Sequence, residues 1–160
     1  MNKYDTKKEI AEHCRKRNKY ETEARKIIPQ WKEQFYSDKD WTITFTNNEW
    51  DSTDFYINNT PCELKERWVT DMNQYEKYKR EGFVLTKSKI DSNECFFYHI
   101  PLTNELLYIT KNKILKGIEA NDIKTITINV NKYNFAPNLG KKPLDMLLIP
   151  YDYWTKYELK

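Results

Sequence analysis

Apolar side chains recur at three- and four-residue steps over residues 20–35, a spacing that is typical of an amphipathic helix packed on a flat surface. The apolar positions are Tyr20, Ala24, Ile27, Ile28, Trp31 and Phe35. Pro29 lies inside this pattern and is expected to kink the helix or to start a new turn. A charged helix that begins at a capping box of Thr6 and Glu9 is predicted ahead of it, over about 6–18.

Alternation of apolar and polar residues then predicts strands. Trp41, Ile43 and Phe45 alternate with threonines, as in a strand with one buried face. The same criteria predict three more strands, at 54–57, 62–69 and 83–85. A helix is expected between the last two, from a cap at Thr70 to about residue 78, and it should end near Gly82.

The second half of the chain mixes both kinds of pattern. Strands are predicted at 95–100, 106–109 and 123–130, with a helix over 113–120 between the last two. Pro137, Gly140 and Pro143 indicate a loop, after which 144–149 is predicted to be a buried strand or turn and 151–159 a closing helix. With no internal repeat or linker, the sequence predicts a single α/β domain over 1–160, in which a mixed central sheet is flanked by helices.

The charges of 54–67 fall on one face of the hairpin that these strands predict. If 58–61 form its loop, Ile57 faces Cys62 and Asp54 faces Lys65. Because successive side chains of a strand point to opposite faces, one face of the hairpin then carries Asp54, Tyr56, Glu63 and Lys65. The apolar face receives Phe55, Ile57, Cys62 and Leu64.

Two carboxylates and a lysine in one hairpin could form a metal-dependent catalytic site. Mg²⁺ prefers oxygen ligands and usually takes one or two protein carboxylates, with water and substrate phosphate as its other ligands. Asp54 and Glu63 are therefore the candidate metal ligands, and Lys65 could orient or deprotonate water or stabilise developing charge. The simpler alternative is a surface ion pair between Asp54 and Lys65 with Glu63 solvated.

Composition narrows the possible functions. The 27 basic and 24 acidic residues give a net charge of only +3, so a nucleic-acid surface would have to be a local patch. Three glycines cannot build a GxxxxGK loop or a GxGxxG turn, and three scattered cysteines with two histidines lack the spacing of a zinc site. Without a signal-like or long apolar segment, we expect a cytoplasmic protein, in a bacterium or a phage-infected cell, that does not cross a membrane.

At Asp54 and at Glu63-Leu64-Lys65 the sequence resembles the restriction-endonuclease-like superfamily, whose motif is written PD-(D/E)xK. The gap of eight residues fits that motif, and the order helix, three strands, helix, strand fits the αβββαβ core of the family, here over about 20–85. Residues of about 94–160 would then form a C-terminal α/β extension. The resemblance implies a nuclease that hydrolyses DNA phosphodiester bonds by metal-activated water, with Mg²⁺ as cofactor and Mn²⁺ able to substitute.

The resemblance leaves two choices open. Thr53 replaces the usual proline, and Asp51 competes with Asp54, which we prefer because of the hairpin register. Many members of the family add a glutamate from the first helix. Glu21, three residues before an alanine as in the family's Glu-x-x-Ala, is preferred to Glu23 as this fourth catalytic residue.

Candidate DNA contacts follow the motif along the chain. Basic side chains beside a metal centre neutralise phosphates without reading sequence. The residues considered are Arg67, Gln74, Tyr78, Lys79 and Arg80, with Trp68, Lys77, Lys87 and Lys89 nearby. Gln74 and Tyr78 have the QxxxY spacing of RecB-like members of the family, although the alternative is that they are ordinary helix residues.

Junction and flap DNA are candidate substrates, and a homodimer is one expectation because two-strand cutting commonly calls for a symmetric pair. The competing hypothesis is a catalytically inactive member of the superfamily that binds nucleic acid or a protein partner.

Overall fold

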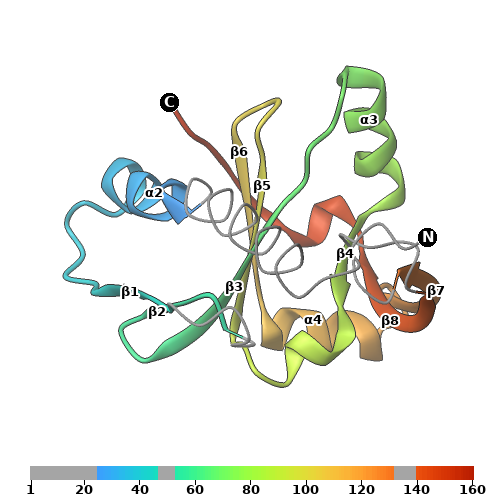
Figure 1. Cartoon of the computed structure of the whole chain (residues 1–160). Coiled ribbons are helices and arrows are strands. Elements are labelled where there is room, and N and C mark those ends of the chain that lie inside the picture. The colour runs from blue at the N-terminus through green and yellow to red at the C-terminus, as the bar shows by residue number, and fades with distance from the viewer. Residues whose placement is uncertain (1–24, 47–52, 132–139) are drawn as a thin grey trace, which may run out of the picture.

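The computed structural model describes residues 25–46, 53–131 and 140–160, and its architecture is α/β, with a mixed central sheet flanked by helices (Figure 1). This fold class agrees with the prediction. The predicted helix over 6–18, and any helix before residue 25, lie outside the described residues.

The central sheet has six strands within the described residues. Their order across the sheet is β1 (Ile43–Phe45), β2 (Phe55–Ile57), β3 (Thr60–Glu66), β5 (Cys95–Ile100), β6 (Glu105–Thr110) and β9 (Thr155–Glu158). β3 and β5 run parallel, whereas the other neighbours run antiparallel. The predicted hairpin therefore lies at one side of the sheet, and its second strand is covered along both edges.

A second sheet of three strands, in the order β4 (Phe83–Thr86), β8 (Lys141–Ile149) and β7 (Lys124–Asn131), packs beside the first. The sequence placed the strand at 83–85 in the same core as β3, and this placement is wrong: β4 pairs with β8, and β5 takes the position beside β3. Gly82 helps to explain the pairing, because a Cβ atom there would lie 2.8 Å from the carbonyl oxygen of Ile149. Only glycine lets β8 approach so closely at that point.

Three helices of the described residues flank the sheets: α2 (Ile27–Phe35), α3 (Met72–Glu81) and α4 (Lys111–Glu119). Pro29 lies in the first turn of α2, where its missing N–H leaves no bond unmade. α3 is capped by Asp71 instead of Thr70, since the Asp71 carboxylate accepts a hydrogen bond of 2.9 Å from the backbone N–H of Gln74.

The end of the chain differs from the prediction. Residues 151–159 form a short 3-10 helix, η3 (Tyr151–Tyr153), followed by strand β9, instead of a helix. Pairing of β9 with β6 satisfies its backbone and turns Tyr157 toward the ring of Trp31. Pro143, predicted to lie in a loop, pairs with Asn129 within β8.

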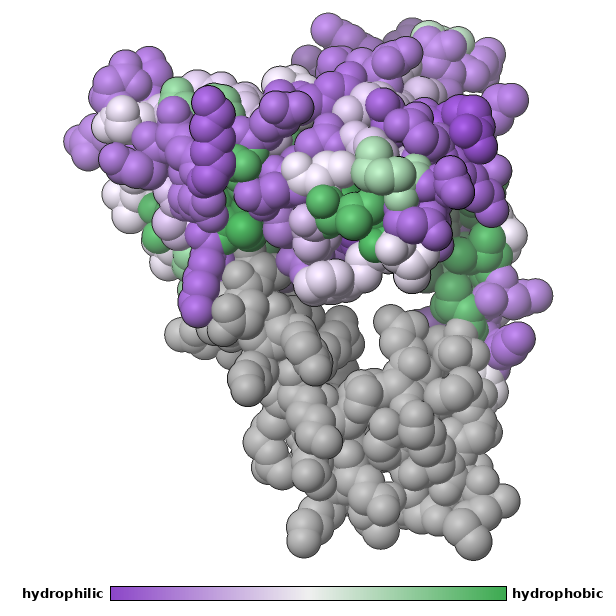
Figure 2. All heavy atoms as spheres, turned by 90° about the horizontal axis from the view of Figure 1, so that it is seen from above, coloured by the Kyte–Doolittle hydropathy of each residue, from purple (hydrophilic) through white to green (hydrophobic). Residues whose placement is uncertain are grey.

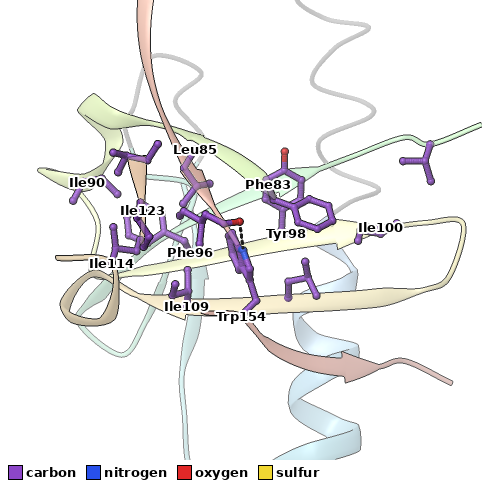
Figure 3. Packing of buried hydrophobic residues seen from close by; sticks show 14 of the residues in the cluster. Phe83, Leu85, Ile90, Phe96, Tyr98, Ile100, Ile109, Ile114, Ile123 and Trp154 are labelled. Carbon is purple, nitrogen blue, oxygen red and sulfur yellow. Dashed lines mark hydrogen bonds between the residues drawn. The ribbon is translucent and has the colours of Figure 1, made fainter. Parts of the chain in front are cut away.

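The two faces of the central sheet carry separate apolar clusters. On one face Ile28 and Trp31 of α2 pack against Phe55, Cys62 and other residues. On the opposite face the second sheet, α3 and α4 enclose a larger cluster, shown in Figure 3. Its aromatic centre consists of Phe83, Phe96, Tyr98 and Trp154.

The surface is mostly polar. In Figure 2 hydrophilic side chains cover most of the described surface, and apolar residues lie in separate small patches. Trp68, which is 70% exposed, is the most exposed of the large apolar side chains in the described residues. None of the helices in residues 25–46, 53–131 and 140–160 is both long enough and apolar enough to span a bilayer.

Candidate active site

The hairpin of β2 and β3 has a tighter turn than the sequence predicted. Phe55 pairs with Cys62 and Ile57 with Thr60, so the loop is Asn58-Asn59 and the predicted pairing of Ile57 with Cys62 is wrong. Asn58 adopts a φ of 54°, in the left-handed region that asparagine tolerates, and its side chain accepts a hydrogen bond of 3.0 Å from the N–H of Thr42.

The predicted faces nevertheless hold. The partner of each β2 residue shifts by two positions, and because side chains alternate with a period of two, an even shift leaves every residue on its original face. Phe55 and Cys62 are fully buried in the α2-facing cluster, and β3 pairs Glu63 with Phe96 and Lys65 with Tyr98 on the opposite face. Continuing the observed register brings Asp54 opposite Glu63 instead of Lys65.

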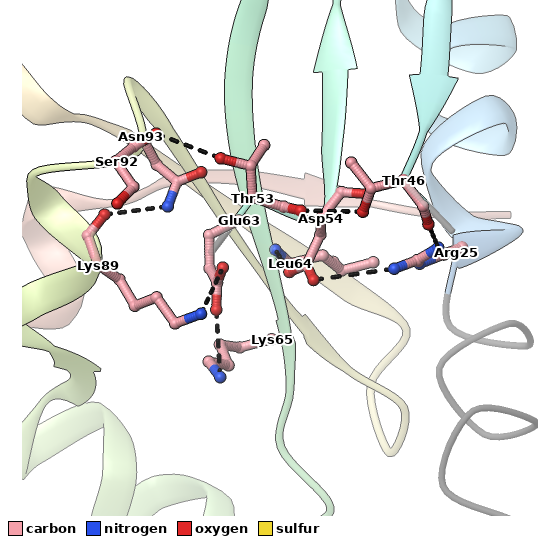
Figure 4. A network of polar contacts seen from close by, with 10 residues as sticks. All are labelled: Arg25, Thr46, Thr53, Asp54, Glu63, Leu64, Lys65, Lys89, Ser92 and Asn93. Carbon is pink, nitrogen blue, oxygen red and sulfur yellow. Dashed lines mark hydrogen bonds and ion pairs between the residues drawn. The ribbon is translucent and has the colours of Figure 1, made fainter. Parts of the chain in front are cut away.

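Glu63 is buried among charges (Figure 4). Its side chain is 3% exposed, and its Oε1 atom lies 3.2 Å from the Nζ atom of Lys65. The Nζ atom of Lys89 lies 3.9 Å from Oε2, which accepts no hydrogen bond from the described residues. Burial, with a smaller contribution from the nearby Asp54 charge, raises the pKa of Glu63 from 4.5 to about 7 although both lysines oppose this shift.

Asp54 immediately precedes β2, and its carboxylate is held by the backbone of β3. Its Oδ2 atom accepts a hydrogen bond of 2.7 Å from the N–H of Leu64, and its Oδ1 atom lies 3.9 Å from the guanidinium of Arg25. Figure 4 shows the Asp54 side chain turned toward these two partners and the Glu63 side chain turned toward Lys65 and Lys89. The Asp54 side chain is 26% exposed, so solvent or a ligand can reach it.

Lys65 extends from β3 toward solvent, with 40% of its side chain exposed. Desolvation lowers the pKa of Lys65, but the attraction of Glu63 and Asp54 outweighs it, so the net direction is upward. The side chain is therefore an ammonium ion at neutral pH. A cation at this position suits charge stabilisation better than proton abstraction.

The donor set around Glu63 fits a hard divalent cation. A buried carboxylate with one oxygen that accepts no hydrogen bond, and a second carboxylate just before the neighbouring strand, are the ligand types that Mg²⁺ uses. In the described part of the chain no group of three or more histidine, cysteine or acidic side chains is placed to hold a metal. Of the acidic residues that the sequence analysis proposed for the site, Asp54 and Glu63 lie within the described residues.

The other acidic candidates, Glu21, Glu23 and Asp51, lie outside the described residues. Their predicted roles, including the preference for Glu21, stay predictions. Tyr56 is partly buried on the same face of the hairpin as Glu63.

The candidate DNA contacts divide into two groups. Gln74 and Tyr78 make structural contacts: the Oε1 atom of Gln74 accepts a hydrogen bond of 2.7 Å from the N–H of Thr70, and the ring of Tyr78 stacks on Phe83. Arg67 is partly buried, with its guanidinium 3.0 Å from the hydroxyl of Tyr98 and over the ring of Tyr78.

The basic residues of α3 are more accessible. Arg80 is exposed near the end of the helix, whereas Lys79 lies 3.8 Å from Glu76 and over the rings of Tyr75 and Tyr151. Contact with DNA stays a prediction for all five residues.

Sequence reasoning missed two partners of the carboxylates. Lys89 was considered only among the basic residues near the candidate DNA contacts, yet it comes from the 3-10 helix η1 (Lys87–Ile90) after β4 and reaches Glu63. Arg25 was not singled out, although it contacts Asp54 and donates to the carbonyl oxygen of Thr46. Both contacts join segments far apart in the sequence, and no local pattern indicates them.

Comparisons with known proteins do not show a family for this chain. The chain matches no protein-family model, and no curated protein matches its sequence. One similar solved structure is described as "D212, a nuclease from a fusselovirus": it is 16% identical, the alignment covers 80% of this chain and 77% of that chain, and the TM-score is 0.47. A likeness at this level does not indicate a shared activity.

Proposed function

We propose that this chain is a Mg²⁺-dependent nuclease that hydrolyses phosphodiester bonds in DNA. The observation that carries the proposal is Glu63, a buried carboxylate whose Oε2 atom accepts no hydrogen bond from the described residues. Lys65 and Lys89 pair with the charge of Glu63, but a buried oxygen without a hydrogen bond keeps the capacity to bind a metal ion. The motif resemblance at Asp54 and at residues 63–65 supports the same assignment.

Asp54 and Glu63 would hold the metal. Bound Mg²⁺ would polarise a phosphodiester and lower the pKa of a bound water, and Mn²⁺ is expected to substitute for it. The ammonium of Lys65, 3.2 Å from Glu63, would lie beside the reacting phosphate and stabilise the negative charge that develops there. Lys89 would help to hold Glu63 in its ionised form.

The test compares cleavage of labelled duplex, single-stranded, flap and junction DNA with Mg²⁺, Mn²⁺ or EDTA. Lys65→Ala should abolish cleavage and preserve both the circular-dichroism spectrum and DNA binding. Lys124→Ala, at the exposed start of β7, is the matched control and should cleave like the wild-type protein. Persistent cleavage in Lys65→Ala would overturn the assigned role of that lysine.

An inactive nucleic-acid- or protein-binding module is the alternative outcome of the same experiment. In that case DNA is bound but not cut with either metal, and Lys65→Ala behaves like the wild-type protein. An RNA panel under the same conditions separates a ribonuclease from a deoxyribonuclease. Retained metal binding in a protein that carries both Asp54→Ala and Glu63→Ala would overturn the proposed ligands.

A further inference from the structure

Two cysteines lie side by side on the parallel strands of the central sheet. Cys62 of β3 and Cys95 of β5 are in-register partners, and both are free thiols. Neighbouring strands lie roughly 4.8 Å apart, and Cα atoms of disulfide-linked cysteines are usually about 4.4–6.8 Å apart. The backbone therefore already holds the two residues within bonding range.

The two thiols differ in exposure: Cys95 is partly exposed, whereas Cys62 is fully buried. Cys95 lines a cavity of about 310 Å³ whose walls are largely aromatic. The aromatic residues are Trp31, Tyr36, Trp41, Tyr108 and Tyr157. Cys62 is fully buried behind it, so a small reagent that enters this cavity meets Cys95 first.

The surroundings of Cys95 favour its thiolate. A hydrogen bond from Cys62 lowers the pKa of Cys95, a contact with the Tyr108 hydroxyl 3.5 Å away acts in the same direction, and burial opposes both. The S–H of Cys62 can donate a hydrogen bond to the carbonyl oxygen of Thr60 at 3.4 Å. The two thiols thus differ in access, and the surroundings of Cys95 favour its reaction.

We propose that Cys95 is a peroxide-reactive site and that Cys62 is its resolving partner, so that the pair forms a reversible disulfide linking β3 and β5. The thiolate of Cys95 attacks one oxygen of hydrogen peroxide, the O–O bond breaks, and hydroxide leaves, which gives a sulfenic acid. The sulfur of Cys62 then attacks the sulfur of Cys95. The S–O bond breaks, the S–S bond forms, and the departing hydroxide takes the Cys62 proton and leaves as water.

This inference is independent of the proposed nuclease activity, because the cavity lies on the α2-facing side of the sheet and Glu63 lies on the other. The reaction needs only the peroxide as oxidant.

The experiment treats the native 160-residue chain with hydrogen peroxide, in a wild-type and a Cys14→Ser form. In both forms the mass should fall by two hydrogen atoms, peptide mapping should place a disulfide between Cys62 and Cys95, and dithiothreitol should reverse it. With Cys62→Ala the reaction should stop at a sulfenic acid that dimedone traps on Cys95. With Cys95→Ser, Cys62 should stay unmodified until the protein is unfolded.

A second measurement does not depend on the disulfide. Iodoacetamide should alkylate Cys95 at least about tenfold faster than Cys62 in the native protein. Equal rates, a disulfide that involves Cys14, or a native protein that keeps both thiols after peroxide treatment would overturn the proposal. Circular dichroism before and after treatment shows whether each variant is folded, and a variant that is unfolded is replaced by the Cys→Val form.

Discussion

Replacing Glu63 by glutamine is expected to stabilise the metal-free protein at alkaline pH while removing its metal site. Burial raises the pKa of Glu63 from 4.5 to about 7, so the folded state favours the neutral acid. A raised carboxyl pKa contributes stability that is fully present below pH 4.5 and is lost as the pH rises through about 7. Glutamine is uncharged at every pH and resembles the neutral acid. The stability that the neutral side chain contributes is therefore kept at alkaline pH.

The magnitude follows from the difference between the two pKa values. At 1.36 kcal/mol for each pKa unit, the wild-type protein should lose about 3 kcal/mol of unfolding free energy from this group across the transition. The Glu63 side chain is only 3% exposed, so solvent screening reduces this figure little. The difference in unfolding free energy between the variant and the wild-type protein should therefore change by about 3 kcal/mol in favour of the variant when the pH is raised from acid to alkaline.

The assay is urea unfolding followed by tryptophan fluorescence, with EDTA present, at a series of pH values on both sides of 7. Constant differences between the proteins, such as those from altered packing, cancel when the comparison is made across pH. A difference in unfolding free energy that does not change with pH would refute the reasoning. In a parallel series at alkaline pH, Mg²⁺ should stabilise the wild-type protein and leave the variant unchanged.

Three further predictions follow from the same structure. Cleavage at subsaturating Mg²⁺ should fall about tenfold for each pH unit below 7, because protons compete for Glu63, and a flat pH profile would contradict this. Gly82→Ala should lower the unfolding free energy by about 1–3 kcal/mol in urea titrations, since φ is +104° and the new Cβ would meet the carbonyl oxygen of Ile149. Tyr75→Phe should cost about 1–2 kcal/mol in the same assay, because it removes a hydrogen bond to the buried carboxylate of Glu105, and an unchanged urea midpoint would count against this.

The faces of the hairpin could be predicted from the sequence because alternation is a local property of strands. Phe55 and Cys62 are apolar, whereas Asp54 and Glu63 are acidic. A register shift by an even number of residues keeps the two members of each pair on the same face of the hairpin. The register itself could not be predicted. It depends on Asn58 adopting a left-handed conformation, and an Asn-Asn-Thr-Pro segment is compatible with both a two-residue and a four-residue loop.

The predictions of secondary structure and strand pairing were wrong where pairing between distant parts of the chain decides the structure. Residues 151–159 satisfy both helical and strand spacing, and hydrogen bonds to β6 select the strand. Likewise, the residues of 83–86 do not by themselves indicate whether their strand joins the central sheet or a second sheet. The partner β8 lies more than fifty residues further along the chain, so the choice depends on contacts that a local pattern does not contain.

The second half of the chain belongs to the candidate site, although the motif lies in the first half. Glu63 is buried because β5 pairs with β3 and places Phe96 on the same face, and Lys89 reaches it from the segment between the two sheets. A chain that ended at residue 85 would lack both residues, and β3 would become an unpaired edge. The raised pKa of Glu63 is therefore a property of the whole fold, because the burial that causes it comes from strands outside the motif.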